Sequence, residues 1–341
     1  AAGSIGSEIA RQVLHFEPDS VLLVDQAETP LFEVEQEFLN KFDDLADKAS
    51  FIMANVKNLS SMEQIFQQRE LDIVFHAAAY KHVPLMEENP HEAVHVNVFG
   101  TKTIANLAVE YGVEKFIMVS TDKTVNPTNV MGASKRIAEM YTQCLNSKQS
   151  ETQFIATRFG NVLGSNGSVI PIFKRQIKEG GPLTVTHKNV KRYFMTIPEA
   201  CNLVLEAGAM GHGGEIYLFD MGKPVKIYDL ACKMIKLSGL QLGKDIDIEI
   251  IGLRRGEKLF EELFTDKENL IETDHPKIKK AKVENFSNSQ VSILLDQLSS
   301  VLFAGDDYEL VHVLKRLVPE YKSQNSKFQN LDANTELLDS V

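Results

Sequence analysis

Residues 115–136 read KFIMVSTDKTVNPTNVMGASKR, and this stretch decides the fold. The apolar run Lys115–Val119 predicts a buried strand. Met131 and Lys135 are four residues apart, so they lie on one face of the helix that follows. The end of the strand therefore presents the hydroxyl of Thr121, the carboxylate of Asp122 and the ammonium group of Lys123. The ammonium group of Lys135 on the helix lies near them. These groups are equipped for acid/base chemistry, and we expect an active site here.

The first eight residues, AAGSIGSE, predict the end of a glycine-rich turn that leads into a helix. Gly3 and Gly6 have the spacing of the last two glycines of a dinucleotide-binding turn, where backbone amides and a helix N-terminus face a pyrophosphate. We expect Gly3, Ser4, Ile5 and Gly6 to bind this cofactor. Because the strand that should precede such a turn is absent, we expect residue 1 to lie inside a domain.

Two further strands extend this cofactor hypothesis. The strand Val21–Val24 ends in Asp25, 19 residues after Gly6, where a carboxylate fits the hydrogen bond to a ribose diol. Asp25 as an ordinary strand-end turn residue is the alternative. No Arg or Lys follows closely, so we expect NAD rather than NADP. We place Asn55 and Val56 against the adenine, and expect the small residues Ala77, Ala78 and Ala79 to admit the dinucleotide at a strand end.

The alternation of strands and helices predicts an α/β fold: a doubly wound, Rossmann-like parallel sheet whose first strand is absent, with a smaller α/β sugar-binding lobe. One long helix is expected from about Pro90 to Glu110. We assign residues 1–158 to an NAD-binding domain and 159–285 mainly to the substrate lobe, interleaved with the first. We expect C-terminal helices over 286–322, and a polar tail over 323–341 that frays.

Composition narrows the function. The net charge is −11, so wrapping nucleic acid is not the expected role. Cys144, Cys201 and Cys232 lack metal-ligand or redox spacing, and we expect reduced thiols in a bacterial cytoplasmic protein and no metal. No apolar run is long enough to span a bilayer.

The run Ser-Thr-Asp-Lys, followed by Asn-Pro-Thr-Asn-Val-Met-Gly-Ala-Ser-Lys, resembles the active-site segment of nucleotide-sugar 4,6-dehydratases in the extended short-chain dehydrogenase/reductase superfamily. The resemblance is to the bacterial UDP-N-acetylglucosamine 4,6-dehydratases of surface polysaccharide and glycan synthesis, and it covers roughly residues 1–285. Most of the superfamily has Tyr where this chain has Met131. The same departure recurs in the large membrane-anchored branch, so a membrane anchor upstream of residue 1 and a homo-oligomer are expectations too.

The resemblance implies an NAD-dependent loss of water from UDP-N-acetylglucosamine, giving a UDP-4-keto-6-deoxy sugar. It implies that Thr121 bonds the 4-oxygen, Asp122 is the acid for the leaving 6-hydroxyl, Lys123 is the carbon-5 base, and Lys135 holds the nicotinamide ribose. We expect burial and Lys135 to lower the pKa of Lys123. The expected substrate-binding residues are Lys81, Asn161, Ser168, Val169, Arg192, Arg255 and Glu257. We interpret Glu261 and Glu262 as surface charges.

Two other functions stay open: a nucleotide-sugar 4-epimerase and a non-catalytic NAD-binding regulator. The thioether of Met131 cannot take the 4-hydroxyl proton. Asp122, Lys123 or a water remains for that step. The configuration at carbon 5 of the product is also open, with retention favoured by the Met-bearing branch.

Overall fold

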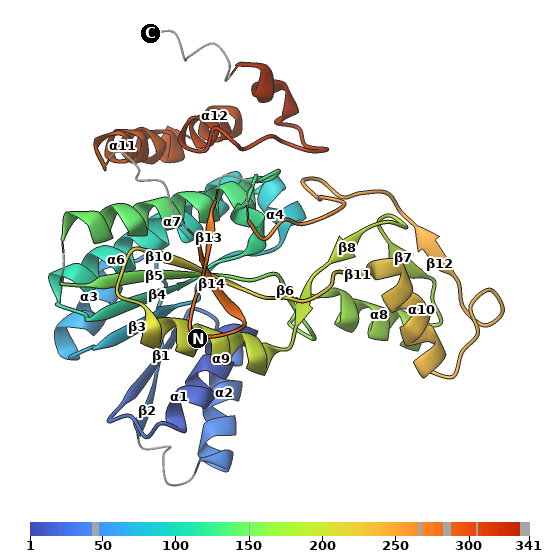
Figure 1. Ribbon diagram of the computed structural model, residues 1–341, viewed down its shortest axis with the longest axis horizontal. Coiled ribbons are helices and arrows are strands. Elements are labelled where there is room, and N and C mark those ends of the chain that lie inside the picture. Colours follow the sequence, from blue (N-terminus) through green and yellow to red (C-terminus); the bar gives the residue numbers. More distant parts are fainter. Residues whose placement is uncertain (43–47, 150, 265–267, 282–287, 305, 335–341) are drawn as a thin grey trace.

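A six-stranded sheet in the spatial order β13-β14-β10-β5-β4-β3 forms the centre of the computed structural model, which describes residues 1–42, 48–149, 151–264, 268–281, 288–304 and 306–334 (Figure 1). The strands are β3 (Ile73–His76), β4 (Lys115–Val119), β5 (Gln153–Arg158), β10 (Glu215–Phe219), β13 (Leu270–Glu272) and β14 (Ile278–Ala281). β3, β4, β5 and β10 pair in parallel, and the β14 and β13 edge is antiparallel. A separate parallel pair joins β1 (Val21–Asp25) to β2 (Ala49–Met53). The predicted α/β class and the strand at residues 115–119 are confirmed.

Helices pack on both faces of this sheet and on the β1–β2 pair. They are α1 (Ser4–Leu14), α2 (Glu28–Lys41), α3 (Leu59–Gln68), α4 (Val83–Glu88), α5 (Pro90–Ala93), the π-helix η2 (Val94–Gly100), α6 (Thr101–Glu110), α7 (Val130–Lys148) and α9 (Ile197–Met210). Side chains alternate along β4 as a pleated strand requires. Phe116 and Met118 belong to the buried cluster of α3 and α6, whereas Ile117 belongs to the cluster of α1 and α9. The all-apolar sequence of β4 therefore reflects burial on two faces.

A smaller lobe lies to the right of the sheet in Figure 1. It comprises β6 (Asn161–Val162), β7 (Leu183–Val185), β8 (Lys191–Arg192), β9 (Phe194–Met195), β11 (Val225–Lys226), β12 (Ile248–Ile250), α8 (Val169–Lys178) and α10 (Ile227–Leu237). Phe173, Leu183 and Ile235 lie in its own apolar core. The chain returns from this lobe to the main sheet at α9 and β10, so the two parts interleave in sequence.

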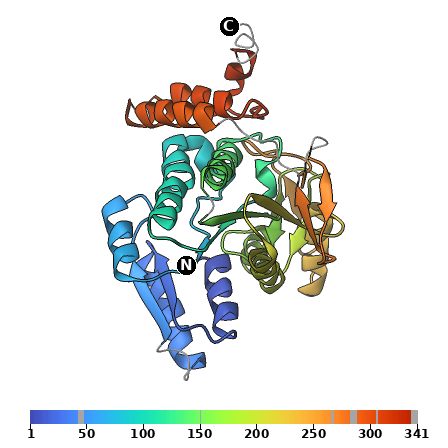
Figure 2. The ribbon, with the colours of Figure 1, turned by 60° about the vertical axis from the view of Figure 1, so that its left-hand side comes forward.

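The C-terminal helices α11 (Asn288–Ala304) and α12 (Asp307–Leu317) pack over α7, and the short helix η4 (Gln329–Asn334) follows (Figures 1 and 2). The intervening segment is bound to the body: Lys322 N–H donates to Pro127 O at 3.1 Å, and Phe328 is fully buried. The expectation of a frayed tail is therefore wrong for residues 323–334, because apolar side chains anchor them. Residues 335–341 lie outside the described part. Within the described ranges, no helix combines the length and apolarity needed to cross a membrane.

Candidate active site

The ends of the parallel strands bring the predicted catalytic segments to one edge of the sheet. β4 leads into Ser120–Lys123, and β5 leads into Phe159–Asn161. Two backbone bonds hold these segments together beyond the strands: Ser120 N–H donates to Thr157 O at 2.7 Å, and Asp122 N–H donates to Phe159 O at 3.1 Å. The carboxyl edge of a parallel sheet is where α/β proteins bind ligands.

The predicted Thr121, Asp122 and Lys123 form one hydrogen-bonded group with Asn161. Lys123 Nζ lies 2.9 Å from Asp122 Oδ1 and 3.3 Å from Asn161 Oδ1. The Thr121 hydroxyl donates to the same Asp122 oxygen at 2.9 Å. Asp122 is buried, and its second oxygen, Oδ2, has no hydrogen-bond partner within the described protein. A buried carboxylate oxygen without a partner is costly, so Oδ2 is ready to bond a ligand.

Glu261 is the residue that sequence reasoning missed. It was interpreted as a surface charge, but its side chain is only 4% exposed, and its Oε1 lies 3.8 Å from Lys123 Nζ. The second oxygen, Oε2, is buried with no hydrogen-bond partner among the described residues. The surface interpretation is wrong for Glu261, because the irregular segment that carries it turns the side chain inward. Glu262, whose side chain is 52% exposed, does lie at the surface.

Arg192 and Glu257, both predicted to bind substrate, lie beside Glu261 and contact each other. Arg192 Nη2 lies 3.3 Å from Glu257 Oε1, and Arg192 Nε lies 3.9 Å from Glu261 Oε1. The same guanidinium donates to the backbone oxygens of Lys191 and Lys258, each at 2.8 Å. The fork of Arg192 is thus largely occupied by the protein itself.

The expected lowering of the Lys123 pKa is wrong. Burial opposes the charge of this ammonium group, but the carboxylates of Asp122 and Glu261 outweigh burial, so the pKa of Lys123 is raised. The cation that counteracts them is Arg192, not Lys135. Lys123 is therefore an ammonium ion in the resting site.

Met131 and Lys135 lie on α7 as predicted but have different surroundings. Met131 is 3% exposed and belongs to the same apolar cluster as Met86, Val94 and Val98, so it brings no polar atom to the turn. Lys135 is buried and donates to Val119 O at 2.9 Å. Burial lowers the pKa of Lys135 to about 8.

A buried ion network beneath the turn holds its shape. Arg158 Nη2 and Nε lie 2.7 and 2.9 Å from the two carboxylate oxygens of Glu139. The Ser120 and Thr124 hydroxyls donate to Glu139 Oε1 at 2.6 and 3.1 Å. Burial alone would raise the pKa of Glu139, but Arg158 outweighs it and lowers the pKa to about 2. Glu139 is therefore ionised and fixes both ends of the Thr121–Lys123 turn.

Three of the predicted cofactor residues, Gly3, Gly6 and Asp25, lie together at the N-terminus of α1. Gly3 is the N-cap of α1 and offers no side-chain cap, which leaves the first helical amides to face an anion. Asp25, at the end of β1, accepts from the backbone N–H groups of Ala2 and Ala27 at 2.7 and 2.9 Å. A Cβ on Gly6 would lie 2.9 Å from the Ala1 backbone, so only glycine allows the turn this close to the helix.

Asn55, Val56 and Ala77–Ala79, predicted to contact the dinucleotide, lie next to three different elements. Asn55 Nδ2 donates to Gln26 Oε1 at 2.6 Å, next to Asp25. Val56 packs so closely on η2 that a Cβ on Gly100 would lie 2.7 Å from it. Ala77–Ala79 follow β3. Within the described ranges no group of three or more His, Cys, Asp and Glu side chains is arranged to hold a metal ion.

The loop before α8 contacts residues of both the predicted cofactor set and the predicted substrate set. Asn166 N–H lies 3.3 Å from Ser4 Oγ, and Lys81 Nζ donates to Asn166 O at 2.9 Å. Ser168 is the N-cap of α8, with Val169 as its first helical residue, and the Ser168 hydroxyl is buried without a partner in the described protein. Arg255 is not brought into the Lys123 cluster: its side chain is 53% exposed and pairs with Glu88.

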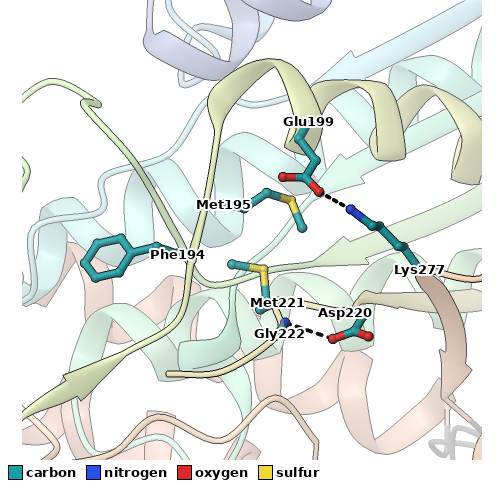
Figure 3. A pocket seen from close by; sticks show the side chains of 7 residues that line it. All are labelled: Phe194, Met195, Glu199, Asp220, Met221, Gly222 and Lys277. Atoms are coloured by element: carbon teal, nitrogen blue, oxygen red, sulfur yellow. Dashed lines mark hydrogen bonds and ion pairs between the residues drawn. The ribbon is translucent and has the colours of Figure 1, made fainter. Parts of the chain in front are cut away.

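A cavity of about 220 Å³ opens beside these strand ends, and none of the residues lining it was predicted to be in the site. Glu199 and Lys277, which both line it, form an ion pair of 2.5 Å. Figure 3 shows this pair with the Met195 and Met221 side chains beside it. A Cβ on Gly160 would lie 3.5 Å from Met221 and 3.0 Å from Asp122 Oδ2. The bare Gly160 therefore lets Asp122 and the wall of this cavity approach each other.

Comparison with known proteins identifies the family of this chain. Residues 1–283 match the family model described as "Polysaccharide biosynthesis protein". The chain is 50% identical over 298 residues to the capsular polysaccharide biosynthesis protein CapD of Staphylococcus aureus, covering 87% of the chain and 49% of CapD. The chain thus spans about half the length of this relative.

Other relatives carry two kinds of name. The UDP-N-acetylglucosamine 4,6-dehydratase (inverting) of Campylobacter jejuni is 33% identical over 263 residues, covering 76% of the chain and 74% of the relative. The UDP-glucose 4-epimerase of Rickettsia bellii is 34% identical over 295 residues, covering 85% and 80%.

Solved structures agree on the fold. Pen from Bacillus thuringiensis superposes with a TM-score of 0.74 at 33% identity, covering 86% of this chain and 95% of Pen. The dTDP-glucose 4,6-dehydratase DesIV of Streptomyces venezuelae, solved with NAD bound, has a TM-score of 0.63 at 22% identity, covering 73% and 82%. The chain therefore belongs to the polysaccharide biosynthesis protein family, and its relatives include nucleotide-sugar dehydratases and epimerases.

Proposed function

We propose that the chain catalyses the NAD-dependent 4,6-dehydration of UDP-N-acetylglucosamine, giving a UDP-4-keto-6-deoxy-N-acetylhexosamine for bacterial surface polysaccharide or glycan synthesis. One observation carries the proposal: the ion pair of the buried Asp122 with the mostly buried Lys123, 2.9 Å apart, at the end of β4. Removal of a carbon-5 proton and of a 6-hydroxyl group needs both an acid and a base at one place. The dehydratase named among the relatives supports this choice.

The pair can supply both groups by one internal proton transfer. Lys123 passes a proton along its hydrogen bond to Asp122, so that an N–H bond breaks and an O–H bond forms with no change in net charge. Neutral Lys123 is then a base for the carbon-5 proton, and protonated Asp122 is an acid for the leaving 6-hydroxyl. Thr121 would hydrogen-bond the 4-oxygen, and Asn161 would hold Lys123 in place. The 4-hydroxyl proton, released when carbon 4 is oxidised, would pass to Asp122, Lys123 or a water and so replace the proton that leaves with the 6-hydroxyl.

NAD fits the residues around the N-terminus of α1. Gly3, Ser4, Ile5 and Gly6 would face its pyrophosphate, Asp25 its adenosine ribose, and Lys135 its nicotinamide ribose. When bound, NAD would supply a hydride acceptor for carbon 4 and a hydride donor for carbon 6. No Arg or Lys follows Asp25 closely in the sequence to compensate a 2′-phosphate, so denaturing the purified protein should release NAD. Release of mainly NADP would disprove this specificity.

The substrate would bind between the lobes with its diphosphate near Ser168, Val169 and Asn161 and its nucleotide end toward Arg255. Lys81 is a further candidate contact, because burial lowers the pKa of its ammonium group and a bound anion would stabilise that charge. Arg192 and Glu257, which bond each other, would shape the sugar end rather than clamp phosphate directly. We further propose that the protein is a cytoplasmic homo-oligomer, with a membrane anchor outside the present chain.

A 4-epimerase is the second candidate, because a relative carries that name. An epimerase needs a group that moves the 4-hydroxyl proton but has no use for an acid/base pair aimed at carbons 5 and 6. Incubation with UDP-N-acetylglucosamine, followed by mass spectrometry, separates the candidates. The dehydratase proposal predicts a product lighter by one water; an unchanged mass with an altered sugar would establish the epimerase, and no change would favour the regulator.

The configuration at carbon 5 of the product can be determined from the same incubation. Retention is our expectation, whereas the Campylobacter jejuni relative is named as inverting. Analysis of the sugar ring by nuclear magnetic resonance distinguishes the two outcomes.

A further inference from the structure

Glu261 is a second carboxyl group beside the Asp122–Lys123 pair, and the proposed reaction does not yet use it. Its Oε1 lies 3.8 Å from Lys123 Nζ, a distance that leaves it a charge partner rather than a hydrogen-bond partner. Its Oε2 is buried and unbonded within the described protein. Glu261 therefore acts on Lys123 mainly through its charge.

The surrounding groups do not neutralise Glu261 fully. The charged groups that face it are Lys123, Asp122, Arg192 and Lys258. Arg192 is shared with Glu257, and Lys258 Nζ donates to Val125 O at 2.9 Å and lies 3.4 Å from Glu262. Lys123 is thus the main cation for two buried carboxyl groups. Such an excess of negative charge in a buried site favours taking up one proton.

We propose that Glu261 controls the proton affinity of Lys123. When the Glu261 carboxyl is neutral, Lys123 is held by Asp122 alone and can pass a proton to it. When Glu261 is ionised, two carboxylates hold Lys123 as an ammonium ion, and the amine base cannot form. Glu261 is a positioning residue in this scheme, because it acts through Lys123 and not on the sugar. The inference rests on the proposed dehydratase activity.

The direction of the Glu261 equilibrium agrees with this role. Burial raises the pKa of Glu261, and the negative charge of Asp122 raises it further, against the opposing charges of Lys123 and Arg192. The neutral form therefore persists at a higher pH than in an exposed glutamate. Activity should fall as pH rises through this pKa, because the ionised form locks Lys123.

The first test is the pH profile of dehydration in Glu261→Gln, which mimics the neutral carboxyl at every pH. The variant should stay active and lose the alkaline decline that the wild type shows. Glu262→Gln, the exposed neighbour, is the matched control and should keep the wild-type profile. A Glu261→Gln profile that matches the wild type, or a variant that is inactive at every pH, would overturn the proposal.

The second test needs no substrate. Acetic anhydride labelling of Lys123 across a pH series, read by mass spectrometry of its peptide, measures the pKa of this amine directly. Loss of one carboxylate at this distance should lower that pKa by about 1 to 3 pH units in Glu261→Gln, and by less in Glu261→Asp, which keeps the charge. An unchanged pKa would overturn the proposal even if the enzyme is active. If the wild type fails to remove water from UDP-N-acetylglucosamine, the proposed function is wrong, and the labelling result still decides what Glu261 does to Lys123.

Discussion

Replacing Arg158 with Met should destabilise the protein strongly, because it leaves Glu139 charged and buried. Arg158 is 1% exposed, Glu139 is not exposed at all, and the two share bonds of 2.7 and 2.9 Å. Breaking one side of a buried ion pair costs about 3–5 kcal/mol. The pKa of Glu139 gives a similar figure, since a fall from its ordinary 4.5 to about 2 corresponds to about 3 kcal/mol.

Urea unfolding followed by circular dichroism measures this loss. The double variant Arg158→Met, Glu139→Gln should recover a large part of the stability, because the fully buried Glu139 charge is removed together with Arg158. The other partners of this pair, Glu268 and Arg136, are 12% and 13% exposed and reach solvent. Lys279→Met is a surface control: its pair with Glu272 is exposed, and such pairs contribute about 0–1 kcal/mol. An Arg158→Met loss below about 1 kcal/mol, or a double variant less stable than the single one, would refute the argument.

The same pair predicts a pH dependence. The folded-state pKa of Glu139 is below its unfolded value, so its stabilisation is complete above about 4.5 and is lost as pH falls toward 2. The unfolding free energy of the wild type should therefore fall over this range. The double variant should lose less stability over the same range, and an equal loss in both would contradict the assignment.

Three further variants test the site. Met131→Leu conserves volume in the apolar cluster, so kcat should stay within about threefold of the wild type; a large loss would show that the thioether has a chemical role. A Cβ on Gly132 would lie 2.3 Å from Lys123 O, so Gly132→Ala should displace the Thr121–Lys123 turn. The variant should have a lower kcat and lose about 1–3 kcal/mol of stability. Wild-type kinetics would contradict this. We expect Arg255 to turn from Glu88 to the phosphate, so Arg255→Ala should weaken UDP binding, measured by calorimetry, by about 1.5–3 kcal/mol. The control Arg254→Ala should leave UDP binding unchanged. Unchanged affinity in Arg255→Ala would remove Arg255 from the site.

Local sequence signals predicted the strand at residues 115–119 and the polar turn that follows it. The apolar run at residues 115–119 is typical of a strand covered on both faces, and the structure shows its three central residues buried. The polar residues after it could lie only at the strand end. The family resemblance predicted Asn161, which follows the next strand, as a substrate-binding residue but did not predict its contact with Lys123. The structure shows that contact, because parallel strands end at one edge of the sheet.

Features that depend on distant contacts were missed. The expected single helix from about Pro90 to Glu110 contains the π-helical segment Val94–Gly100. There Asn97 bonds both backbone groups of Tyr80 and the Ser134 hydroxyl, and no local pattern shows those contacts. The inward turn of Glu261 is similar: consecutive glutamates suggest a surface, and only the fold shows that one of them meets Lys123.

The most direct test of the central claim is incubation with UDP-N-acetylglucosamine in heavy water. The account predicts a product that has lost water and carries one deuterium at carbon 5, because the base exchanges the proton it removes. Lys123→Ala should abolish this exchange while still allowing oxidation at carbon 4, seen as the absorbance of reduced nicotinamide. A dehydrated product without deuterium at carbon 5, or wild-type exchange in Lys123→Ala, would contradict the assignment of the Asp122–Lys123 pair.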